Sequence, residues 1–298
     1  MIEIDRIGQI ETLEEIYDEY ASGRSNAVYI SSDDSRLRDL GIQKGDVITA
    51  SSESINTGKM YISEITFFGI KTRIKALSVK ASAFDTRNEH YSHISFEELT
   101  KLIAEEAGLT LNMMDCPDVY YLDITRVERD PMRFLAERMM LEGYQFRITD
   151  DTLIVFDERR AEEEESEQLF EEEFEMAPEY RTSDSGLISK VNNSYQTEDM
   201  LIETTVESGR SGKVLRISME TSSHDESRRF SKGIIREKNK YEFLTEGKLQ
   251  GIRYRAGNTV DLQGTPEGFA GNQYIYRVYH DLKKENQTIY ARKVIGGL

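Results

Sequence analysis

One pattern of glycines, a tyrosine and aliphatic residues occurs twice in this chain, once near each end. The first copy contains Gly41, Gly45, Gly58, Tyr61, Ile65 and Ile74, and the second contains Gly251, Gly257, Gly271, Tyr274, Val278 and Ile289. In both copies the tyrosine follows a glycine by three positions, and the next aliphatic residue follows the tyrosine by four. A pattern that is used twice predicts two related folding units. The alternative is that any two glycine-bounded β-meanders share such spacings.

Four of these glycines are predicted to be structural turn residues: Gly45, Gly58, Gly257 and Gly271. We expect Gly45 and Gly257 to enter a strand at positive φ, where a residue with a side chain is disfavoured by about 1 kcal/mol.

Short β-branched and aromatic runs, separated by Gly, Asp and Ser, follow one another over residues 28–84. The runs are Val28–Ile30, Val47–Thr49, Met60–Ile62, Thr66–Phe68 and Arg73–Lys75. They predict an antiparallel meander, and their regular spacing favours a sandwich or a small barrel. Before them, Thr12 and Glu15 have the spacing of a capping box, which together with an apolar stripe predicts a short helix. The stripe consists of Leu13, Ile16, Tyr17 and Tyr20.

Helix signals dominate residues 94–157. Two helices are marked by capping residues, Ser95, Glu98 and Gly108 for the first, and Asp130, Pro131 and Gly143 for the second. These residue types at helix ends satisfy free backbone groups or allow the chain to turn. An alternating hairpin over 144–156 follows, so this region is predicted to be an α+β lobe.

The segment 161–175 contains nine Glu and no Lys or Arg. Its like charges repel and it offers few apolar groups, so we expect a linker. The alternative is a structured acidic helix that docks a partner through Leu169, Phe170 and Phe174. Strands resume at residue 185, and a polar helix is predicted over 223–238. The expected domains are a first β-barrel (1–85), the α+β lobe (86–157), the acidic linker (158–180) and a second β-barrel (181–298).

The charge of the chain narrows the classes of function. A formal net charge of −17 argues against specific nucleic-acid binding, because phosphate contacts need clustered Lys and Arg. No stretch approaches the roughly 18 apolar residues of a membrane span, and the N-terminal residues lack the basic and apolar regions of a signal peptide. One basic stretch marks either a contact with an acidic partner subunit or a solvated helix face. It comprises Arg228, Arg229, Lys232, Arg236, Lys238 and Lys240.

Residue types that often carry catalysis form no recognisable set here. His90 and His93 have an i, i+3 spacing but are expected to lie in a polar loop with no third His or Cys ligand nearby, so solvated side chains are expected. His280 ends an alternating strand and is expected to be packed or hydrogen-bonded. Cys116, the single cysteine, has no nucleophile signature. The sequence therefore predicts a protein that is not an enzyme, with no catalytic, cofactor-binding or metal site and no cofactor.

Three parts of the sequence carry motifs of a known family. The first is SRLRDLGIQKGDVITA with GKMYISEITFFGIKTRIKALSVKA, and the last is GIRYRAGNTVDLQG with NQYIYRVYHDLKKENQTIYARKV, where His280 takes a V-x-H-like position. Between them lie SFEELTKLIAEEAGL and DITRVERDPMRFLAERMMLEGYQFRITDDTLIVFD, in which Phe134, Leu135, Ala136, Glu137, Gly143 and Tyr144 match the order FLxxLAxxxGY. Together, over about residues 35–298, they resemble the phage late control gene D proteins, the baseplate hub proteins of contractile tails and related injection systems.

This resemblance implies a mainly β fold with an α+β lobe and two related antiparallel β-barrel tube domains. It implies a homotrimer in which three chains supply six barrels, and which joins a hexameric tail tube to a trimeric central spike. The implied partners are the tail tube protein and the central spike protein, with tape-measure and baseplate wedge proteins as further candidates. DNA would pass through an acidic lumen without specific binding. The N-terminal region is shorter than is usual in the family, and no spike or lysozyme module follows, so the spike is expected to be a separate chain.

The expected setting is the baseplate of a virion or of a tail-like particle, after synthesis in the bacterial cytoplasm without a signal peptide. Whether the particle is a phage, a tail-like bacteriocin or another injection system stays open. Two other functions also stay open: a tail-associated peptidoglycan hydrolase, and a baseplate wedge or tail-terminator subunit. The hydrolase would need a catalytic carboxylate or a Cys/His set in a cleft.

Overall fold

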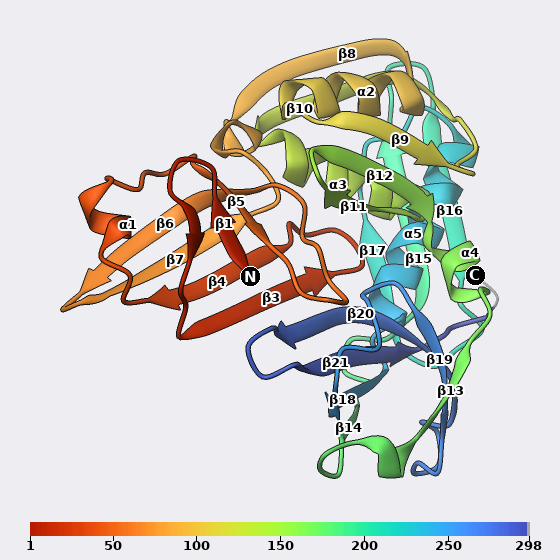
Figure 1. Ribbon diagram of the computed structural model, residues 1–298. Coiled ribbons are helices and arrows are strands. Elements are labelled where there is room, and N and C mark those ends of the chain that lie inside the picture. The colour runs from red at the N-terminus through yellow and green to blue at the C-terminus, as the bar shows by residue number, and fades with distance from the viewer. Residues whose placement is uncertain (297–298) are drawn as a thin grey trace.

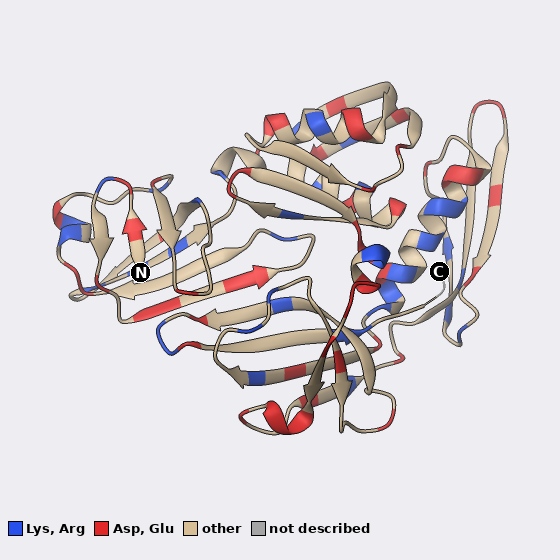
Figure 2. Cartoon of the chain, turned by 45° about the vertical axis from the view of Figure 1, so that its right-hand side comes forward, with Lys and Arg blue, Asp and Glu red and all other residues tan. Residues whose placement is uncertain are grey.

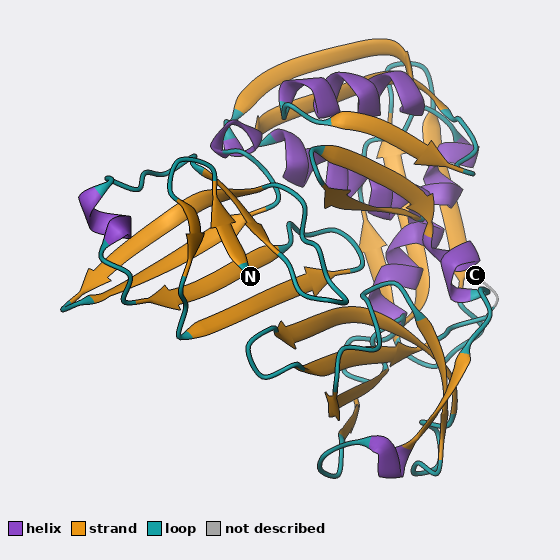
Figure 3. Ribbon diagram, viewed as in Figure 1, coloured by secondary structure: helices purple, strands orange, loops and turns teal. Residues whose placement is uncertain are grey.

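Two β-rich modules and two lobes make up the computed structural model, which describes residues 1–296 of the chain. The first module lies at the left of Figure 1 and the second at the bottom, and the lobes lie above and beside them. Strands form both modules, whereas the longer helices lie in the lobes (Figure 3). The mainly β fold with an α+β lobe is therefore confirmed.

The first β-module contains the N-terminal strands. They are β1 (Ile2–Ile4), β2 (Gly8–Ile10), β3 (Glu14–Tyr20), β4 (Ala27–Ser32), β5 (Val47–Ala50), β6 (Met60–Phe68) and β7 (Lys71–Leu77), with the short helix α1 (Arg36–Asp39) before β5. The predicted runs do form antiparallel strands, but not the simple meander that was expected. Met60–Ile62 and Thr66–Phe68 belong to the one strand β6, and β4 pairs with β7 instead of with β5. Alternate side chains such as Ile30, Ile48 and Ile74 are buried in the module core.

The helix predicted from Thr12 to Tyr20 is wrong, because this segment forms β3. The Thr12 hydroxyl does donate a hydrogen bond to the Glu15 carboxylate, but Glu15 is already part of the strand. β3 has β4 on one edge and β20 on the other, so it is buried on both sides. Its polar residues Asp18 and Glu19 are buried with basic partners from the far end of the chain. Long-range pairing therefore overrides the local helical pattern.

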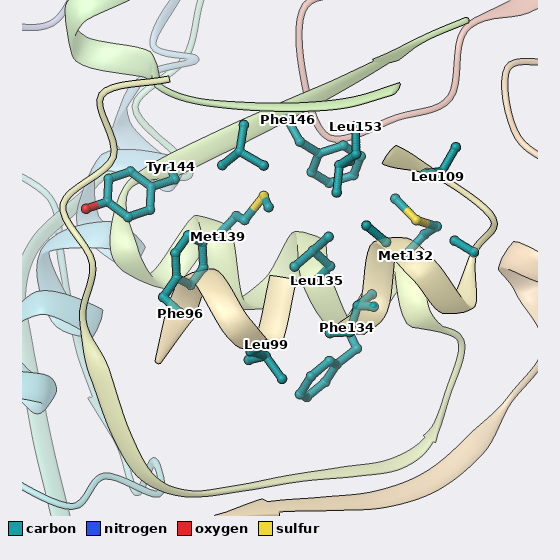
Figure 4. Close-up of a cluster of buried hydrophobic side chains, with 14 of the residues drawn as sticks. Phe96, Leu99, Leu109, Met132, Phe134, Leu135, Met139, Tyr144, Phe146 and Leu153 are labelled. Atoms are coloured by element: carbon teal, nitrogen blue, oxygen red, sulfur yellow. The ribbon is translucent and has the colours of Figure 1, made fainter. Parts of the chain in front are cut away.

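The α+β lobe follows β7. Its elements are the 3₁₀ turn η1 (Ala81–Phe84), β8 (Arg87–Ser95), α2 (Phe96–Glu106), β9 (Thr110–Met114), β10 (Tyr120–Arg129), α3 (Pro131–Glu142), β11 (Tyr144–Thr149) and β12 (Thr152–Asp157). Both predicted helices and the hairpin are confirmed: Ser95 makes a capping box, Asp130 caps α3, and Gly143 ends it with φ of 82°. Figure 4 shows Phe96, Leu135 and neighbouring side chains of both helices facing those of β11 and β12.

The polar stretch that contains His90 and His93 is not a loop but strand β8, which pairs antiparallel with β10. Most of its side chains are exposed. The strand is held by backbone hydrogen bonds to one neighbour and buries almost no side chain, so it lacks the apolar alternation that identifies strands in a sequence.

The acidic segment, for which we expected a linker, is folded. It contains α4 (Glu158–Glu162), β13 (Glu167–Phe170), the 3₁₀ turn η2 (Glu171–Glu173) and β14 (Glu179–Thr182). β13 pairs parallel with β19, β14 pairs antiparallel with β18, and Leu169 and Phe174 are buried in the second module. The few apolar residues alternate with Glu side chains that face solvent or pair with Arg253, so charge repulsion does not prevent packing.

A second lobe is inserted between β14 and β18. It consists of β15 (Ile188–Gln196), β16 (Leu201–Glu207), β17 (Lys213–Ile217) and α5 (His224–Asn239), which confirms the helix predicted over 223–238. Strand β15 lies between the other two, and α5 packs on this small sheet and against α3 of the first lobe. The two lobes are thereby joined through their helices.

The second β-module combines β13 and β14 with β18 (Phe243–Gln250), β19 (Thr259–Gln263), β20 (Gly271–Asp281) and β21 (Asn286–Lys293). In the described part of the chain, both modules belong to one thirteen-stranded sheet with the order β14-β18-β21-β20-β3-β4-β7-β6-β5-β1-β2, from which β19 and β13 branch at β20. Two related β-barrels were expected, but no closed barrel forms within residues 1–296. The reason is that β20 pairs with β3 of the other module instead of closing on its own.

Candidate functional site: the duplicated modules and their seam

The two modules share one strand order over residues 1–296. The path β1-β5-β6-β7-β4-β3 in the first module corresponds to β13-β19-β20-β21-β18-β14 in the second. The chain visits the equivalent strands in the same sequence, with the second lobe inserted between β14 and β18. One difference is that β1 is antiparallel to β5 whereas β13 is parallel to β19. The duplicated sequence pattern thus corresponds to a duplicated topology.

The repeated glycines occupy equivalent turns. The backbone N–H of Gly45 donates to the carbonyl of Ile62 at 2.8 Å, and the N–H of Gly257 donates to that of Ile275, also at 2.8 Å. Their φ angles are 89° and 99°, values at which a residue with a Cβ is strained. The other two glycines of the pattern, Gly58 and Gly271, have φ of 64° and 97°.

Strand register is duplicated as well. Tyr61 of β6 lies opposite Val47 and Leu77, and Tyr274 of β20 lies opposite Thr259 and Arg292. Each strand then has a register shift at the same distance from its tyrosine, between Ile62 and Glu64 in β6 and between Ile275 and Arg277 in β20. Bulges re-aim the strand that carries them, so β6 and β20 bend at the same place.

The modules are joined by the antiparallel pairing of β3 with β20, which we call the seam. Its register runs from Tyr20 opposite Arg277 to Ile16 opposite Asp281. On the outer face of the seam, the Arg277 guanidinium forms a two-pronged ion pair with the Asp18 carboxylate, with distances of 2.7 and 3.0 Å. Such paired hydrogen bonds fix orientation as well as contributing energy.

The inner face of the seam holds a buried polar cluster. Glu19 accepts hydrogen bonds from the Arg255 guanidinium at 2.7 to 3.0 Å, and its carboxylate lies 3.2 Å from Nε2 of His280. Burial raises the pKa of Glu19, but the His280 and Arg255 hydrogen bonds outweigh it and lower the pKa to about 2. The His280 ring is fully buried and stacks on Tyr17. His280 is therefore hydrogen-bonded and packed, as expected.

A second buried ion cluster ties the modules to the lobes. Glu158 of α4 lies 3.2 Å from the Lys240 ammonium and 3.1 Å from the Arg292 guanidinium, and Glu162 pairs with Arg236 and Arg292. These side chains come from α4, the end of α5 and β21. Burial raises the pKa of Glu158, but the charges of Arg292, Lys240 and Arg236 outweigh it and lower the pKa to about 2.

A cavity of about 550 Å³ lies where the seam meets the first lobe. Its lining includes Glu19, Arg147, Asp157, Arg255 and Tyr274. Its buried carboxylates are paired, Glu19 with Arg255 and Asp157 with Arg159. A carboxylate whose pKa is held near 2 is a poor general acid at neutral pH, so Glu19 does not supply the acid that a glycoside hydrolase requires.

Of the other side chains considered for chemistry, the two histidines of β8 lie apart from this cavity, and Cys116 directly follows its lining residues Met114 and Asp115. His90 and His93 are on the exposed β8, where His90 lies 3.2 Å from the Asp123 carboxylate. Burial raises the pKa of the Cys116 thiol to about 12, which leaves little thiolate. Within residues 1–296, no group of three or more His, Cys, Asp or Glu side chains is placed to hold a metal ion. Nor does any described helix have the length and apolar character needed to cross a membrane.

The basic stretch lies on α5 and beyond its end, where Figure 2 shows Lys and Arg side by side along the helix. Part of it faces inward. Arg229 forms an ion pair with Glu142 at 2.8 Å, and Arg236 and Lys240 belong to the buried ion cluster. Lys232 and Lys238 are exposed. The stretch therefore contacts acidic groups of its own chain and leaves only part of a solvated face.

Known structures share this architecture. The 43 kDa tail protein of prophage MuSo2 from Shewanella oneidensis aligns with a TM-score of 0.77 at 11% identity, over 98% of this chain and 97% of its own. The tail protein from Neisseria meningitidis MC58 aligns with a TM-score of 0.77 at 8% identity, over 99% and 96%. The chain has the fold of phage tail proteins. No protein-family model and no curated protein sequence matches it.

The tail-protein fold is also found in a secretion machine. An E. coli component of the type VI secretion system, described as structurally similar to the T4 bacteriophage tail proteins gp27 and gp5, aligns with a TM-score of 0.63 at 11% identity, over 99% of this chain and 77% of its own. At such low identity the comparison establishes the fold alone, whereas the glycine and tyrosine pattern had predicted only that one folding unit is used twice.

Sequence reasoning missed the seam and both buried ion clusters. Asp18, Glu19, Glu158 and Glu162 look like surface carboxylates in the sequence, and each finds its basic partner far along the chain. The structure reveals one further equivalence: Tyr17 and Tyr180 lie at corresponding places in β3 and β14, opposite Val28 and Thr245. The lobe inserted between β14 and β18 separates Tyr180 from the second glycine pattern, so the spacing of the two tyrosines from the glycines does not match in the sequence.

Proposed function

We propose that this protein is a structural baseplate hub of a contractile phage tail or a related injection particle, similar to the late control gene D proteins. In this role it is a homotrimeric adaptor on the tail axis. It joins a hexameric tail tube to a trimeric central spike and performs no catalysis. The tail-protein fold supports the particle setting, and the family motifs support the hub role.

The observation that carries this proposal is the duplication of the β-module within one chain. Equivalent strands, glycine turns and bulges give each chain two nearly interchangeable units. Three chains would then supply six similar units, which suit contacts with a six-fold tube. Heterologous ring contacts need similar surfaces on successive units.

The two lobes, unlike the modules, are not duplicated within the chain. Each lobe occurs once per chain, the first after β7 and the second between β14 and β18. A ring of six modules would therefore carry only three copies of each lobe. Such a ring would have six-fold character where modules are exposed and three-fold character where lobes are exposed, which is the property that a tube-to-spike adaptor requires.

The charge of the chain fits the proposed axial position. With a net charge of −17, a ring of this protein would repel DNA that passes through its lumen, so the DNA would slide without sticking. Tape-measure and baseplate wedge proteins are proposed as further partners in the same particle.

The decisive measurement is the copy number and position of the chain in a reconstruction of the assembled particle. Three copies on the tail axis, between tube and spike, are expected. Six copies, or a position away from the axis, would favour a wedge or terminator subunit. A digestion assay on purified peptidoglycan tests the hydrolase alternative, and the expected result is no activity above buffer.

A further inference from the structure

The second half of β6 presents an unpaired edge. Residues Glu64–Phe68 pair with β7 on one side, and β5 pairs with β6 only at Met60 and Tyr61. Among the described residues, no strand pairs with the other side of Glu64–Phe68. Phe67 and Phe68 on this edge are 54% and 74% exposed, and Ile70 in the following turn is 75% exposed. Exposed apolar edge strands are sites of strand addition.

The equivalent half of β20 is paired and buried. By the register with β7 and β21, Glu64 to Phe68 correspond to Arg277 to Asp281. That half of β20 forms the seam with β3, and Phe67 corresponds to the fully buried His280. In the seam, this half of β20 accepts β3. The corresponding edge of β6 should therefore accept a strand that has the position of β3 in its own module.

Strand β14 is the equivalent of β3, and its outer edge is also unpaired. β14 pairs with β18 just as β3 pairs with β4, which places Tyr180 at the position of Tyr17 and Arg181 at that of Asp18. In the chain as described, β14 has β18 as its neighbour on one side only. Tyr17 is buried at the seam, whereas Tyr180 is half-buried and Arg181 is exposed.

We infer that Glu64–Phe68 of one chain pairs antiparallel with β14 of a second copy, in the register of the seam. Phe68 would lie opposite Glu179, Phe67 opposite Tyr180, Thr66 opposite Arg181 and Ile65 opposite Thr182. This inference names the partner surface of the proposed hub and therefore rests on the proposed function. This intermolecular joint has the same strand pairing as the seam. Each chain contributes its β6 edge to one neighbour and binds the β6 edge of the other neighbour with its own β14.

The side chains at the two edges are complementary in the way the seam predicts. In the seam, Arg277 of β20 pairs diagonally with Asp18 of β3. The corresponding residues of the new joint are Glu64 and Arg181, so the charges exchange places and remain opposite. Neither Glu64 nor Arg181 forms an ion pair with another side chain of residues 1–296.

The inner face of the joint is complementary as well. In the seam, His280 stacks on Tyr17. The equivalent pair is Phe67 and Tyr180, which would bring two aromatic rings together and cover the exposed phenylalanine. Aromatic pairs across antiparallel strands favour association.

A head-to-tail joint of this kind determines the type of assembly. Because β6 binds β14 and not another β6, the contact is heterologous, and such contacts give closed rings when the rotation closes and open filaments when it does not. If the intermolecular joint has the geometry of the seam, successive modules are related by one repeated rotation. The inference therefore excludes a two-fold symmetric dimer through this edge.

Disulfide cross-linking of the full chain tests the register. Cys116 is first replaced by Ser, and the exposed pair Phe68→Cys with Glu179→Cys is introduced. Oxidation at high protein concentration is expected to give covalent oligomers that end at the trimer. The matched control, Thr66→Cys with Glu179→Cys, places the thiols two residues out of register, and it is expected to give about tenfold less product because Cα atoms more than 7 Å apart do not bridge. Equal yields, or no oligomer from either variant, would overturn the inference.

A charge-exchange experiment on Glu64 and Arg181 tests the same pairing independently. Glu64→Arg or Arg181→Glu alone is expected to weaken self-association about tenfold in sedimentation measurements, and the double variant is expected to restore it. Glu53→Arg makes the same charge change elsewhere on the first module and should have no effect. Loss of association in the double variant would count against the pairing.

The two proposals can fail separately. In-register cross-links in a chain that the particle places off the axis would keep the pairing and refute the hub function. An axial trimer in which the in-register cysteines do not cross-link would keep the hub function and refute the pairing.

Discussion

Two buried carboxylates, Glu19 and Glu158, have their pKa lowered from 4.5 to about 2 by basic neighbours that outweigh burial. Because the pKa is lower in the folded chain than in the unfolded chain, each group stabilises the fold fully above pH 4.5, and this stabilisation is lost as pH falls toward 2. Each shift corresponds to about 3 kcal/mol. We expect the free energy of unfolding, measured by denaturant titration, to fall steeply between pH 4.5 and 2; a flat profile there would contradict the pairing described.

Glu158→Gln tests the buried ion cluster directly. The change leaves Lys240 and Arg292 buried with one carboxylate fewer, which is expected to cost about 3 to 5 kcal/mol of folding free energy. The matched control is Glu165→Gln, an exposed position in the same acidic segment, where an effect below about 0.5 kcal/mol is expected. Similar effects of both variants on the denaturation midpoint would argue against a structural role for Glu158.

The sequence predicted the side chains that bond to backbone groups a few positions away. It did not predict the side chains whose partners lie far along the chain. Ser95, Asp130 and Gly143 cap their helices as predicted, because a capping residue contacts the backbone a few positions away. The same local rule applied to Thr12 and Glu15 failed, since the partners of the next residues, Arg255 and Arg277, are at the other end of the chain. No local pattern encodes which carboxylate is buried.

Strand β13 anchors the acidic segment to the second module. Leu169 is fully buried and packs in the core of the second module, although the segment around it is acidic. Leu169→Ala is expected to cost about 2 to 5 kcal/mol, whereas Phe170→Ala, at an exposed position, should cost less than about 1 kcal/mol. Amide exchange is the complementary measurement: slow exchange over residues 167–170 is expected, and fast exchange in the free chain would restore the linker interpretation.

The contact between α5 and α3 depends on Gly233. A Cβ built at this position would overlap the carbonyl oxygens of Met140 and Leu141 at the end of α3. Gly233→Ala should favour the helix by propensity but force the two helices apart, with a net loss of about 1 to 3 kcal/mol. Lys232→Ala, on the exposed side of the same helix, is the control. A stabilised Gly233→Ala variant in thermal unfolding would show that the helices are not in close contact.

Amphipathic helices and the strands β4 to β7 could be predicted because their apolar residues recur with the period of the element, whereas the order in which these strands pair could not. Strands β8 and β3 were missed for opposite reasons. Most of the side chains of β8 are exposed, so it shows no apolar alternation, whereas β3 is covered on both edges and buries acidic residues. Strand β13 was missed because nine Glu in the surrounding segment hide a single buried leucine.

Both modules share one sheet, so a change at the seam should be felt on both sides. Asp18→Ala leaves the Arg277 guanidinium without its two-pronged partner and is expected to cost about 1.5 to 3 kcal/mol. Protection from amide exchange should fall together in β4 and in β21. Asp123→Ala removes an exposed contact with the His90 ring and should cost less than about 1 kcal/mol. Loss of protection in one module alone would show that the seam does not couple them.

The duplicated design of the chain was visible in the sequence, but the way the copies meet was not. Glycine and tyrosine spacings identified β5–β7 and β19–β21 as equivalents, because turn geometry demands particular residues at particular places. Closure into two barrels was expected from the regular strand spacing and from the resemblance to the late control gene D proteins. The pairing of β3 with β20 depends on complementary edges, and an unpaired edge has no sequence signature until its partner is known.

The seam also bears on how the protein is made. β3 is among the first strands to leave the ribosome and its partner β20 is among the last, so during almost all of translation β3 carries an open edge. That edge resembles β14, and the β6 edge of a neighbouring nascent chain could capture it. Long-range strand pairing is slow, and unpaired edges in unfinished chains are sites of misassembly. The chain is therefore most prone to misassembly before residue 271 leaves the ribosome. This risk ends when β20 pairs with β3.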